Sequence, residues 1–542
     1  MSTNAELIAN WRDEPAPLLS VFHAFHDRDG FISEEVLRDI SVGLRIPLAE
    51  LFGTLTFYHH FSCEAPGQSA PRVCTGPVCR LQGGIEILNA LKDEGATEMP
   101  CAGRCDDCVP VIKGHQVFTG KNAEDLSVQS TPLPPKYPGD KEECIFADIR
   151  EQNGNTIEGY QNTGGYEALR KTVTSLTPQH VIQILKDSQL AGRGGAGFPT
   201  GVKWESVLNA PGEPKTIVCN ADEGEPGCFK DRVILDYAPH TIIEGMTLAA
   251  YATGATRGFI YLRYEYPETL RILETAIAEA EKENVLGKDI LNTQFNFDIY
   301  IRRGAGAYVC GEEGSLLNSL QGEHPFPRNR PPYPVTHGFE NLPTVVNNVE
   351  TLAAATQILR KGAAWYKSLS YNPDLSGTKI ISLSGDIQKP GNYEVPFGLP
   401  LKSLLYDWAG GPLPGRKIQA ITSAGLSGGF IGENDLDINI DEPSFQNVGA
   451  MLGAGGIMVF DDTRDMLDVA HNAMEFFAEE SCGKCFPCRI GTHRLTELLS
   501  KPLNQKSKDI IAEIGSVMKA TSACGLGTAA PNITDSLMKL MP

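Results

Sequence analysis

Three closely spaced cysteines near the carboxyl end constrain this chain more than any other feature. The segment "SCGKCFPCRIGT" contains Cys482, Cys485 and Cys488 at x2 spacing, and Cys524 follows after a further helical stretch. Three thiolates at this spacing can converge on one cluster from a single turn, and a distant fourth completes the ligand set. Structural zinc sites usually pair two C-x2-C knuckles instead. The pattern therefore favours a [4Fe–4S] cluster over zinc.

A second and looser group of cysteines lies near the amino end. Cys74-x4-Cys79 and Cys101-x3-Cys105 form two pairs, each after a short predicted strand. On spacing alone, the four thiolates suit a [2Fe–2S] cluster or a zinc ion about equally, and Cys108 is a further candidate ligand. The other cysteines have no partner at ligand spacing and are interpreted as buried and inert: Cys63, Cys144, Cys219, Cys228 and Cys310.

Composition narrows the class of protein. With 14 cysteines in 542 residues, grouped at short spacing, the chain indicates metal or redox chemistry rather than a disulfide scaffold. The formal net charge of −20 opposes non-specific nucleic-acid binding. No apolar run reaches the length of about 18 residues that a membrane span needs. The polar amino end lacks a signal sequence, so we expect a cytoplasmic protein.

Changes in sequence texture predict several structural units, because one hydrophobic core stops growing near roughly 250–300 residues. The boundaries follow from proline-rich stretches and from switches between helical and strand periodicity. The expected units are a helical part at 1–65, a strand-and-turn domain at 66–130, a linker at 131–143, an α/β domain at 144–375, a β-rich module of ubiquitin-like size at 376–460 and a helical domain at 461–542.

The segment "LAGRGGAGFPTGVKW" carries Gly192-x-Gly194-x-x-Gly197, the spacing of a dinucleotide fingerprint. A Rossmann fingerprint follows a strand and opens a helix. Here the preceding "TPQHVIQILKDSQL" has helical periodicity after a capping Thr177, so the sequence argues against a Rossmann domain. Glycines would still let backbone amides approach a phosphate or a flat ring, and Lys203 adds a positive charge nearby. The alternative is a plain glycine-rich turn.

Three further loops carry polar side chains at predicted strand or helix ends. The loop "NADEGEPGCFKDR" follows a strand, and its carboxylates suit sugar hydroxyls better than phosphate. A carboxylate on the adenosine ribose favours NAD over its 2′-phosphorylated relative. The other two loops are "GAGAYVCGEEG", which precedes a helix, and "PTVVNNVET". Loops of this kind serve in binding more often than as solvated surface stripes.

Taken in order, these motifs resemble the NADH-oxidising flavin subunit of respiratory complex I and its relatives in soluble NAD-linked hydrogenases and formate dehydrogenases. The resemblance covers residue 156 to the carboxyl end. The segments "TFYHHF", "RVCTGPVC" and "CAGRC" resemble the small thioredoxin-like [2Fe–2S] subunit of the same complexes, fused in front. The implied fold is a multidomain α/β protein with a thioredoxin-like [2Fe–2S] domain, a non-classical FMN- and NAD(H)-binding α/β domain, a ubiquitin-like (SLBB-type) β-grasp module and a C-terminal helical [4Fe–4S] domain.

The resemblance also implies ligand sets, with hydride transfer carried out by FMN itself and no catalytic side chain. The residues implied for FMN are Gly192, Gly194, Gly195, Asn220, Asp222, Glu223, Tyr308, Asn347 and Asn348. Those implied for NAD(H) are Phe198, Lys203, Glu225, Glu312, Glu313, Arg330 and Tyr333. Cys482, Cys485, Cys488 and Cys524 would hold the [4Fe–4S] cluster, and Cys74, Cys79, Cys101 and Cys105 the [2Fe–2S] cluster. Cys228, Gly314, Ser315 and Ser206 depart from the residues usual in the family.

The functional hypothesis is a diaphorase subunit that passes electrons between NAD(H) and iron–sulfur clusters through FMN. The lead is the β subunit of a cytoplasmic formate dehydrogenase, partnered by a molybdenum or tungsten α subunit with further iron–sulfur clusters. The alternative in the same class is the diaphorase subunit of an NAD-reducing hydrogenase or the flavin subunit of complex I. A non-catalytic, zinc-stabilised scaffold is the alternative from a different class. No nucleic-acid partner and no membrane span are expected.

Overall fold

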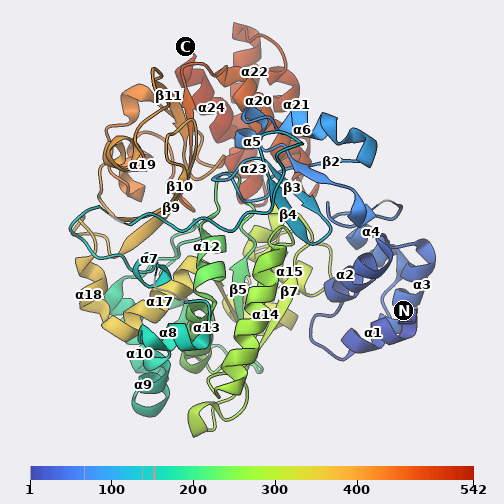
Figure 1. The fold of residues 1–542 in the computed structure, drawn as a ribbon, viewed down its shortest axis with the longest axis vertical. Coiled ribbons are helices and arrows are strands. Elements are labelled where there is room, and N and C mark those ends of the chain that lie inside the picture. The colour runs from blue at the N-terminus through green and yellow to red at the C-terminus, as the bar shows by residue number, and fades with distance from the viewer. Residues whose placement is uncertain (1, 66, 137, 151–153, 542) are drawn as a thin grey trace.

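A parallel four-stranded sheet lies at the centre of the protein, in a computed structural model that describes every residue except 1, 66, 137, 151–153 and 542 (Figure 1). Its strand order is β7-β6-β5-β8. The strands are β5 (Thr216–Ala221), β6 (Arg257–Leu262), β7 (Asp298–Arg303) and β8 (Thr344–Asn348). From β5 the chain moves outward to β6 and β7, then returns to place β8 on the other side. This reversal makes the carboxyl ends of β5 and β8 a topological switch point, where open α/β sheets bind ligands.

Alternating side chains of this sheet enter two different cores. Ile217 and Ile260 pack into a core with the helices of one face, whereas Val218 and Phe259 pack on the opposite face. Helices cover both faces, as parallel sheets require. Those that follow the linker are α7 (Phe146–Ile149), α8 (Ile157–Asn162), α9 (Glu167–Ser175), α10 (Pro178–Ser188), α11 (Thr200–Asn209), α12 (Lys230–Tyr237), α13 (Pro239–Thr253), α14 (Pro267–Lys282), α15 (Glu313–Leu320), α16 (Pro334–His337), α17 (Val349–Lys361) and α18 (Ala363–Ser368).

The amino-terminal helices supply much of the second core. Phe22 and Phe25 are fully buried in the cluster that contains Val218 and Phe259 of the central sheet. Polar contacts join the same surfaces, because the His23 ring Nε2 lies 3.0 Å from the Gly304 carbonyl. Ser33 caps the third of these helices, since its hydroxyl accepts from the Val36 amide. These helices are α1 (Asn4–Arg12), α2 (Leu18–Asp29), α3 (Glu34–Leu44) and α4 (Leu48–Leu55).

A small sheet of order β2-β1-β3-β4 carries the first cysteine group. The strands are β1 (Arg72–Cys74), β2 (Thr97–Met99), β3 (Pro110–Lys113) and β4 (Gln116–Thr119), with helices α5 (Pro77–Leu81) and α6 (Gly84–Ala90). β1 pairs parallel with β2 and antiparallel with β3. Helix α5 contacts the C-terminal helix α20, and β4 contacts α14, so this unit lies between the C-terminal helices and the central domain (Figure 1).

The β-rich module is a five-stranded sheet of order β10-β9-β13-β11-β12. β9 and β10 pair antiparallel and form a hairpin around Lys389. The parallel pair of β9 and β13 gives the sheet the mixed pattern of a β-grasp module. The strands are β9 (Thr378–Gly385), β10 (Gly391–Pro396), β11 (Ile418–Thr422), β12 (Phe430–Gly432) and β13 (Gly456–Asp461), with the helical turns Ser403–Trp408 and α19 (Glu442–Asn447).

The carboxyl end is helical, as predicted, and packs around the second cysteine group. Its helices are α20 (Met466–Glu479), α21 (Phe486–Leu499), α22 (Gln505–Thr521), α23 (Gly525–Ala529) and α24 (Pro531–Leu540). Val78, Cys101 and Cys105 of the first cysteine unit share a hydrophobic cluster with Cys488 and α20. In the part of the chain that the structure describes, no helix is both long and apolar enough to cross a membrane.

Candidate functional site

The glycine-rich loop joins α10 to α11, which confirms the helical context predicted for it. A short bridge closes the loop, with the Gly192 amide donating to the Phe198 carbonyl at 2.9 Å. Residues 194–199 are exposed. A Cβ added at Gly194 would lie 3.0 Å from Asn348 Cβ, so a side chain there would crowd the end of β8. Gly195 has φ +117°, which L side chains rarely adopt. The loop is therefore an open backbone cradle beside the switch point.

Asparagines line the carboxyl ends of the two switch-point strands. Asn220 and Asn348 are paired across β5 and β8, so their positions are adjacent. Asn348 caps α17 by accepting from the Glu350 amide at 2.9 Å, which holds its side chain in place. Asn347 Oδ1 accepts from the Trp204 indole at 2.8 Å. Of the three asparagines predicted to bind flavin, Asn348 thus lies against Gly194 of the loop, whereas Asn347 bonds to Trp204 and Asn220 donates to the Gly311 carbonyl.

The three carboxylates of the acidic loop after β5, those of Asp222, Glu223 and Glu225, lie in different surroundings. Burial raises the pKa of Asp222 well above its usual range, and its Oδ2 has no hydrogen-bond partner among the described residues. Burial also raises the pKa of Glu223 to about 7. Glu225 is bonded to the β-rich module, accepting from the Leu426 and Ser427 amides at 2.8 and 3.0 Å. Its bonds thus differ from those of the other residues predicted to bind the nucleotide.

Most of the predicted nucleotide residues form one charged group at the start of α15. Lys203 Nζ lies 3.4 Å from Glu313 Oε2 and 3.0 Å from the Val346 carbonyl. Arg330 pairs with Glu313 at 2.9 Å and also with Glu312. Glu312 caps α15 through the Ser315 amide at 2.8 Å. Phe198 and Tyr333 are about half exposed, at 49% and 53%, so they leave apolar surface open beside the charges.

The first cysteine set is buried, and its sulfurs are in mutual contact. Cys74, Cys79, Cys101 and Cys105 are each 1–6% exposed. The Cys74 sulfur interacts with those of Cys79 and Cys101, and the Cys101 sulfur also with Cys105. The Gly103 amide donates to Cys101 Sγ at 3.4 Å, the type of bond that stabilises cluster thiolates.

The second set gathers where α21 and α23 begin. Cys485 occupies the N-cap position of α21 and Cys488 lies in the first turn of that helix, while Cys524 occupies the N-cap position of α23. A Cβ added at Gly527 would lie 2.9 Å from Cys488 Cβ, so a glycine there lets the two segments approach. No group of three or more His, Cys, Asp or Glu side chains in the described residues could hold a single metal ion. Each of the two cysteine sets supplies four thiolates, the number of ligands that a [2Fe–2S] or a [4Fe–4S] cluster takes.

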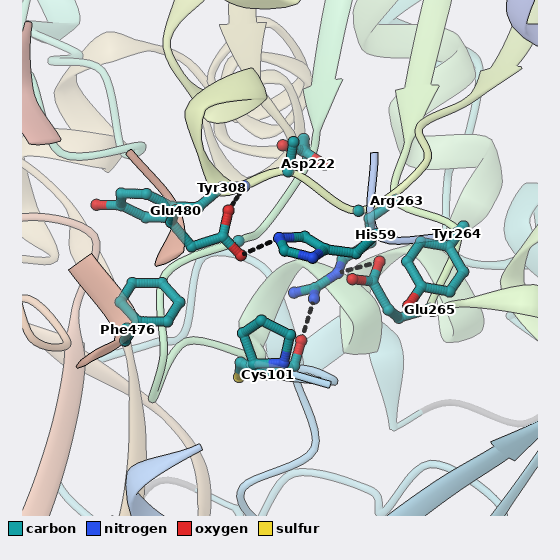
Figure 2. Close-up of a pocket in the computed structure, with 13 residues that line it drawn as sticks. His59, Cys101, Asp222, Arg263, Tyr264, Glu265, Tyr308, Phe476 and Glu480 are labelled. Atoms are coloured by element: carbon teal, nitrogen blue, oxygen red, sulfur yellow. Dashed lines mark hydrogen bonds and ion pairs between the residues drawn. The ribbon is translucent and has the colours of Figure 1, made fainter. Parts of the chain in front are cut away.

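A small cavity joins two residues predicted to bind flavin to the loops of both cysteine sets (Figure 2). Asp222 and Tyr308 line it, together with Cys101 of the first set. The Tyr308 amide donates to Glu480 Oε2 at 2.8 Å, and Glu480 precedes Cys482 by two residues. The volume of about 20 Å³ has room for roughly one water molecule.

The sequence did not predict a functional role for three residues around this cavity, His59, Arg263 and Glu480. Arg263 Nη2 donates to the Cys101 carbonyl at 2.6 Å, and His59 Nε2 lies 3.4 Å from Glu480 Oε1. The histidine pair in "TFYHHF" was the only local signal, because the partners come from distant parts of the chain.

One prediction about isolated cysteines needs correction. Cys144, Cys219, Cys228 and Cys310 are buried as expected, but Cys63 is only partly buried. It lies in the segment that follows α4, where the chain leaves the amino-terminal helices.

Three family models match the chain. They are the Nuo51 FMN-binding domain at residues 185–357, the NADH-ubiquinone oxidoreductase-F iron-sulfur binding region at 468–542 and the thioredoxin-like [2Fe-2S] ferredoxin at 4–117. The last match includes the amino-terminal helices as well as the small sheet.

Curated relatives align with most of their length. An NADH-quinone oxidoreductase subunit of Rhizobium meliloti is 46% identical over 66% of this chain and 85% of its own. The NAD-reducing hydrogenase HoxS subunit alpha of Cupriavidus necator is 33% identical over 97% of this chain and 90% of its own. A crystal structure of an NAD+-reducing [NiFe]-hydrogenase in the H2-reduced state matches with a TM-score of 0.82 at 31% identity, covering 97% of this chain and 91% of that one.

Proposed function

This chain belongs to the family of the NADH-oxidising flavin subunits of complex I and of NAD-reducing hydrogenases. We propose that it is the diaphorase subunit of an NAD+-linked formate dehydrogenase complex. Its cofactors are FMN, NAD(H), a [4Fe–4S] cluster and a [2Fe–2S] cluster. When bound, FMN exchanges a hydride with nicotinamide and exchanges electrons singly with iron–sulfur clusters.

We assign the flavin to the crevice at the switch point. The backbone of Gly192, Gly194 and Gly195 would hold it from one side, and the amides at the ends of β5 and β8 from the other. The buried Oδ2 of Asp222, which has no hydrogen-bond partner in the part of the chain that the structure describes, supports the assignment, because an unsatisfied polar atom is costly unless a ligand meets it. Asn220, Glu223 and Tyr308 would complete this site.

The nucleotide site is assigned to the charged group at the start of α15. Lys203 and Arg330 would meet the phosphates, while Glu313 keeps both cations in position. Phe198 and Tyr333 offer exposed rings for the flat bases. Glu225 would act indirectly, because its hydrogen bond to the Tyr308 hydroxyl at 2.5 Å positions that tyrosine beside the flavin.

The cavity of Figure 2 is the observation that best supports a relay, since Asp222 and Tyr308 share it with Cys101 and with the loop before Cys482.

Electrons would enter or leave the chain at the [4Fe–4S] cluster. Phe486, Ile490 and Val517 are 68%, 47% and 51% exposed on α21 and α22. We propose this apolar surface, beside Cys485, as the docking face of the catalytic subunit.

The identity of the electron donor rests on the partner. Formate is our lead because the thioredoxin-like unit fused in front of the flavin domain suits the diaphorase subunits of formate dehydrogenases. Hydrogen is a second candidate, favoured by the match over nearly the whole chain to an NAD-reducing hydrogenase subunit.

The donor is tested on the complex purified anaerobically with its native partner. NAD+ reduction by formate, without hydrogen, supports the proposal. Reduction by hydrogen alone would replace it by the second candidate. If neither donor works while NADH still reduces artificial dyes, both donors are wrong and only the diaphorase assignment stands.

The relay is tested separately by Cys485→Ala. We expect NADH-driven reduction of the partner to be lost, whereas direct flavin reduction of small dyes persists. Cys63→Ala is the matched control, because that cysteine has no assigned ligand role. Unchanged transfer to the partner in Cys485→Ala would exclude the [4Fe–4S] cluster from the route.

A further inference from the structure

A fifth cysteine lies against the first cysteine set. Cys108 Sγ is 3.8 Å from Cys79 Sγ, and it also approaches the Cys105 carbonyl oxygen at 3.5 Å. Two thiolates on one tetrahedral metal, with metal–sulfur bonds of about 2.3 Å, stand about 3.8 Å apart. The Cys108 sulfur therefore lies close enough to Cys79 to reach the iron that Cys79 would hold.

The loop that carries Cys108 is fixed on both sides. The Asp107 amide donates to the Arg104 carbonyl at 3.0 Å, and the Val109 amide to the Gly120 carbonyl at 2.8 Å. The Asp107 carboxylate also accepts from the Thr119 hydroxyl at 2.8 Å. These bonds tie the loop to β4 and hold the Cys108 sulfur near Cys79.

Cys108 differs from the four predicted ligands in its exposure. Those four are buried, whereas Cys108 is partly exposed and lines a surface groove with Lys121 and Asp125. Its sulfur thus lies between the buried set and solvent. A thiol in this position can reach the cluster without first unfolding the loop.

We propose that Cys108 is a reserve ligand of the amino-terminal [2Fe–2S] cluster, able to replace Cys79. In the exchange, the bond from iron to the Cys79 sulfur breaks and a bond from iron to the Cys108 sulfur forms. The proton released by the Cys108 thiol is taken up by the Cys79 thiolate, and no electron is transferred. The inference goes beyond the diaphorase function and does not depend on the identity of the electron donor.

The test compares Cys79→Ala, Cys108→Ala and the double variant in the full chain with its partner. Iron and sulfide contents and the EPR signal of the dithionite-reduced [2Fe–2S] cluster are measured for each. Cys108→Ala should keep the wild-type signal. Cys79→Ala should retain the cluster with altered g values, and the double variant should lose it. The [4Fe–4S] signal reports in each sample whether the chain has folded.

Two results would overturn the proposal. In one, Cys79→Ala loses the cluster as fully as the double variant; in the other, the double variant retains it. If Cys79→Ala also loses the [4Fe–4S] signal, Cys79→Ser replaces it, because serine keeps the side-chain volume. In Cys79→Ser the EPR spectrum should be that of a cluster with four thiolate ligands. When Cys108→Ala is added, it should change to that of a cluster with one oxygen ligand. Identical spectra for the single and the double variant would refute the exchange. A wild-type chain without the [2Fe–2S] signal contradicts the cofactor assignment and the proposal together, whatever the result of the formate assay.

Discussion

Replacing Glu350 by glutamine should loosen the junction between the flavin domain and the β-rich module. The Glu350 carboxylate is 2% exposed and lies 3.1 Å from Lys230 Nζ and 2.8 Å from Lys379 Nζ. Lys379 is on β9, whereas Lys230 is on α12 and also approaches Asn348 Oδ1 at 3.4 Å. Glu350→Gln would leave two buried ammonium groups without their shared partner.

The expected cost is about 3–5 kcal/mol, the usual penalty for removing one member of a buried ion pair. Burial lowers the pKa of Lys379 to about 8 even with Glu350 present. Without Glu350 this pKa falls further, so Lys379 is neutral in the folded variant at pH 7 but protonated when unfolded. The unfolded state of the variant then binds one more proton than the folded state, so the free energy of unfolding of the variant rises by about 1.4 kcal/mol for each unit of increasing pH. Wild type gains this slope only above pH 8, so the deficit of the variant shrinks as pH approaches 8.

Urea unfolding followed by tryptophan fluorescence measures the effect, because Trp204 is fully buried in the flavin domain. FMN retention should fall in parallel, since Lys230, which approaches Asn348, loses one of its two carboxylate partners among the described residues and keeps only Asp231. Glu281→Gln, at an exposed position on α14, is the matched control. A deficit below about 1 kcal/mol that does not vary with pH would show that Glu350 does not stabilise the two buried lysines.

Two further predictions concern the nucleotide and the buried histidines. Glu313→Gln removes the carboxylate that pairs with both Lys203 and Arg330. It should weaken NADH binding about tenfold, or ~1.4 kcal/mol, at unchanged flavin content. Flavin loss with unchanged NADH affinity would mean that the two sites are exchanged. Burial, and secondarily the charge of Arg72, lowers the pKa of His26 to about 4. Between pH 6.5 and pH 4 this histidine is protonated only in the unfolded chain. The free energy of unfolding should therefore fall by up to about 3 kcal/mol as the pH drops through this range. His26→Phe should remove one proton from this dependence, and an unchanged slope in urea unfolding would contradict the assignment.

The sequence predicted the features that depend on local pattern. Helix α10 ahead of Gly192 was expected from its periodicity, and it correctly argued against a Rossmann domain. The grouping of four cysteines around Cys488 followed from spacing alone. Family models then resolved the choice between zinc and [2Fe–2S] that the spacing of the first set had left open.

Contacts between distant segments could not be predicted. Phe22 belongs to the same hydrophobic cluster as Val218 of the central sheet, and nothing in either segment indicates the other. The ion pair of His59 with Glu480 joins parts of the chain that are equally remote. Glu225 has the polar loop context of a ligand, yet its hydrogen bonds run to a module that only the folded chain brings near. Such pairings depend on how the domains pack, which periodicity and spacing do not encode.

The proposed relay passes electrons from NADH through one flavin to two iron–sulfur clusters held by the same chain. An anaerobic NADH titration of the purified complex, followed by absorbance near about 450 nm and by low-temperature EPR, measures each of these transfers. NADH should bleach the flavin band and the signals of the reduced clusters should develop, with the [4Fe–4S] signal missing in Cys485→Ala. A protein that binds NADH without a flavin band, or whose flavin bleaches while neither cluster signal appears even with dithionite, would exclude the relay.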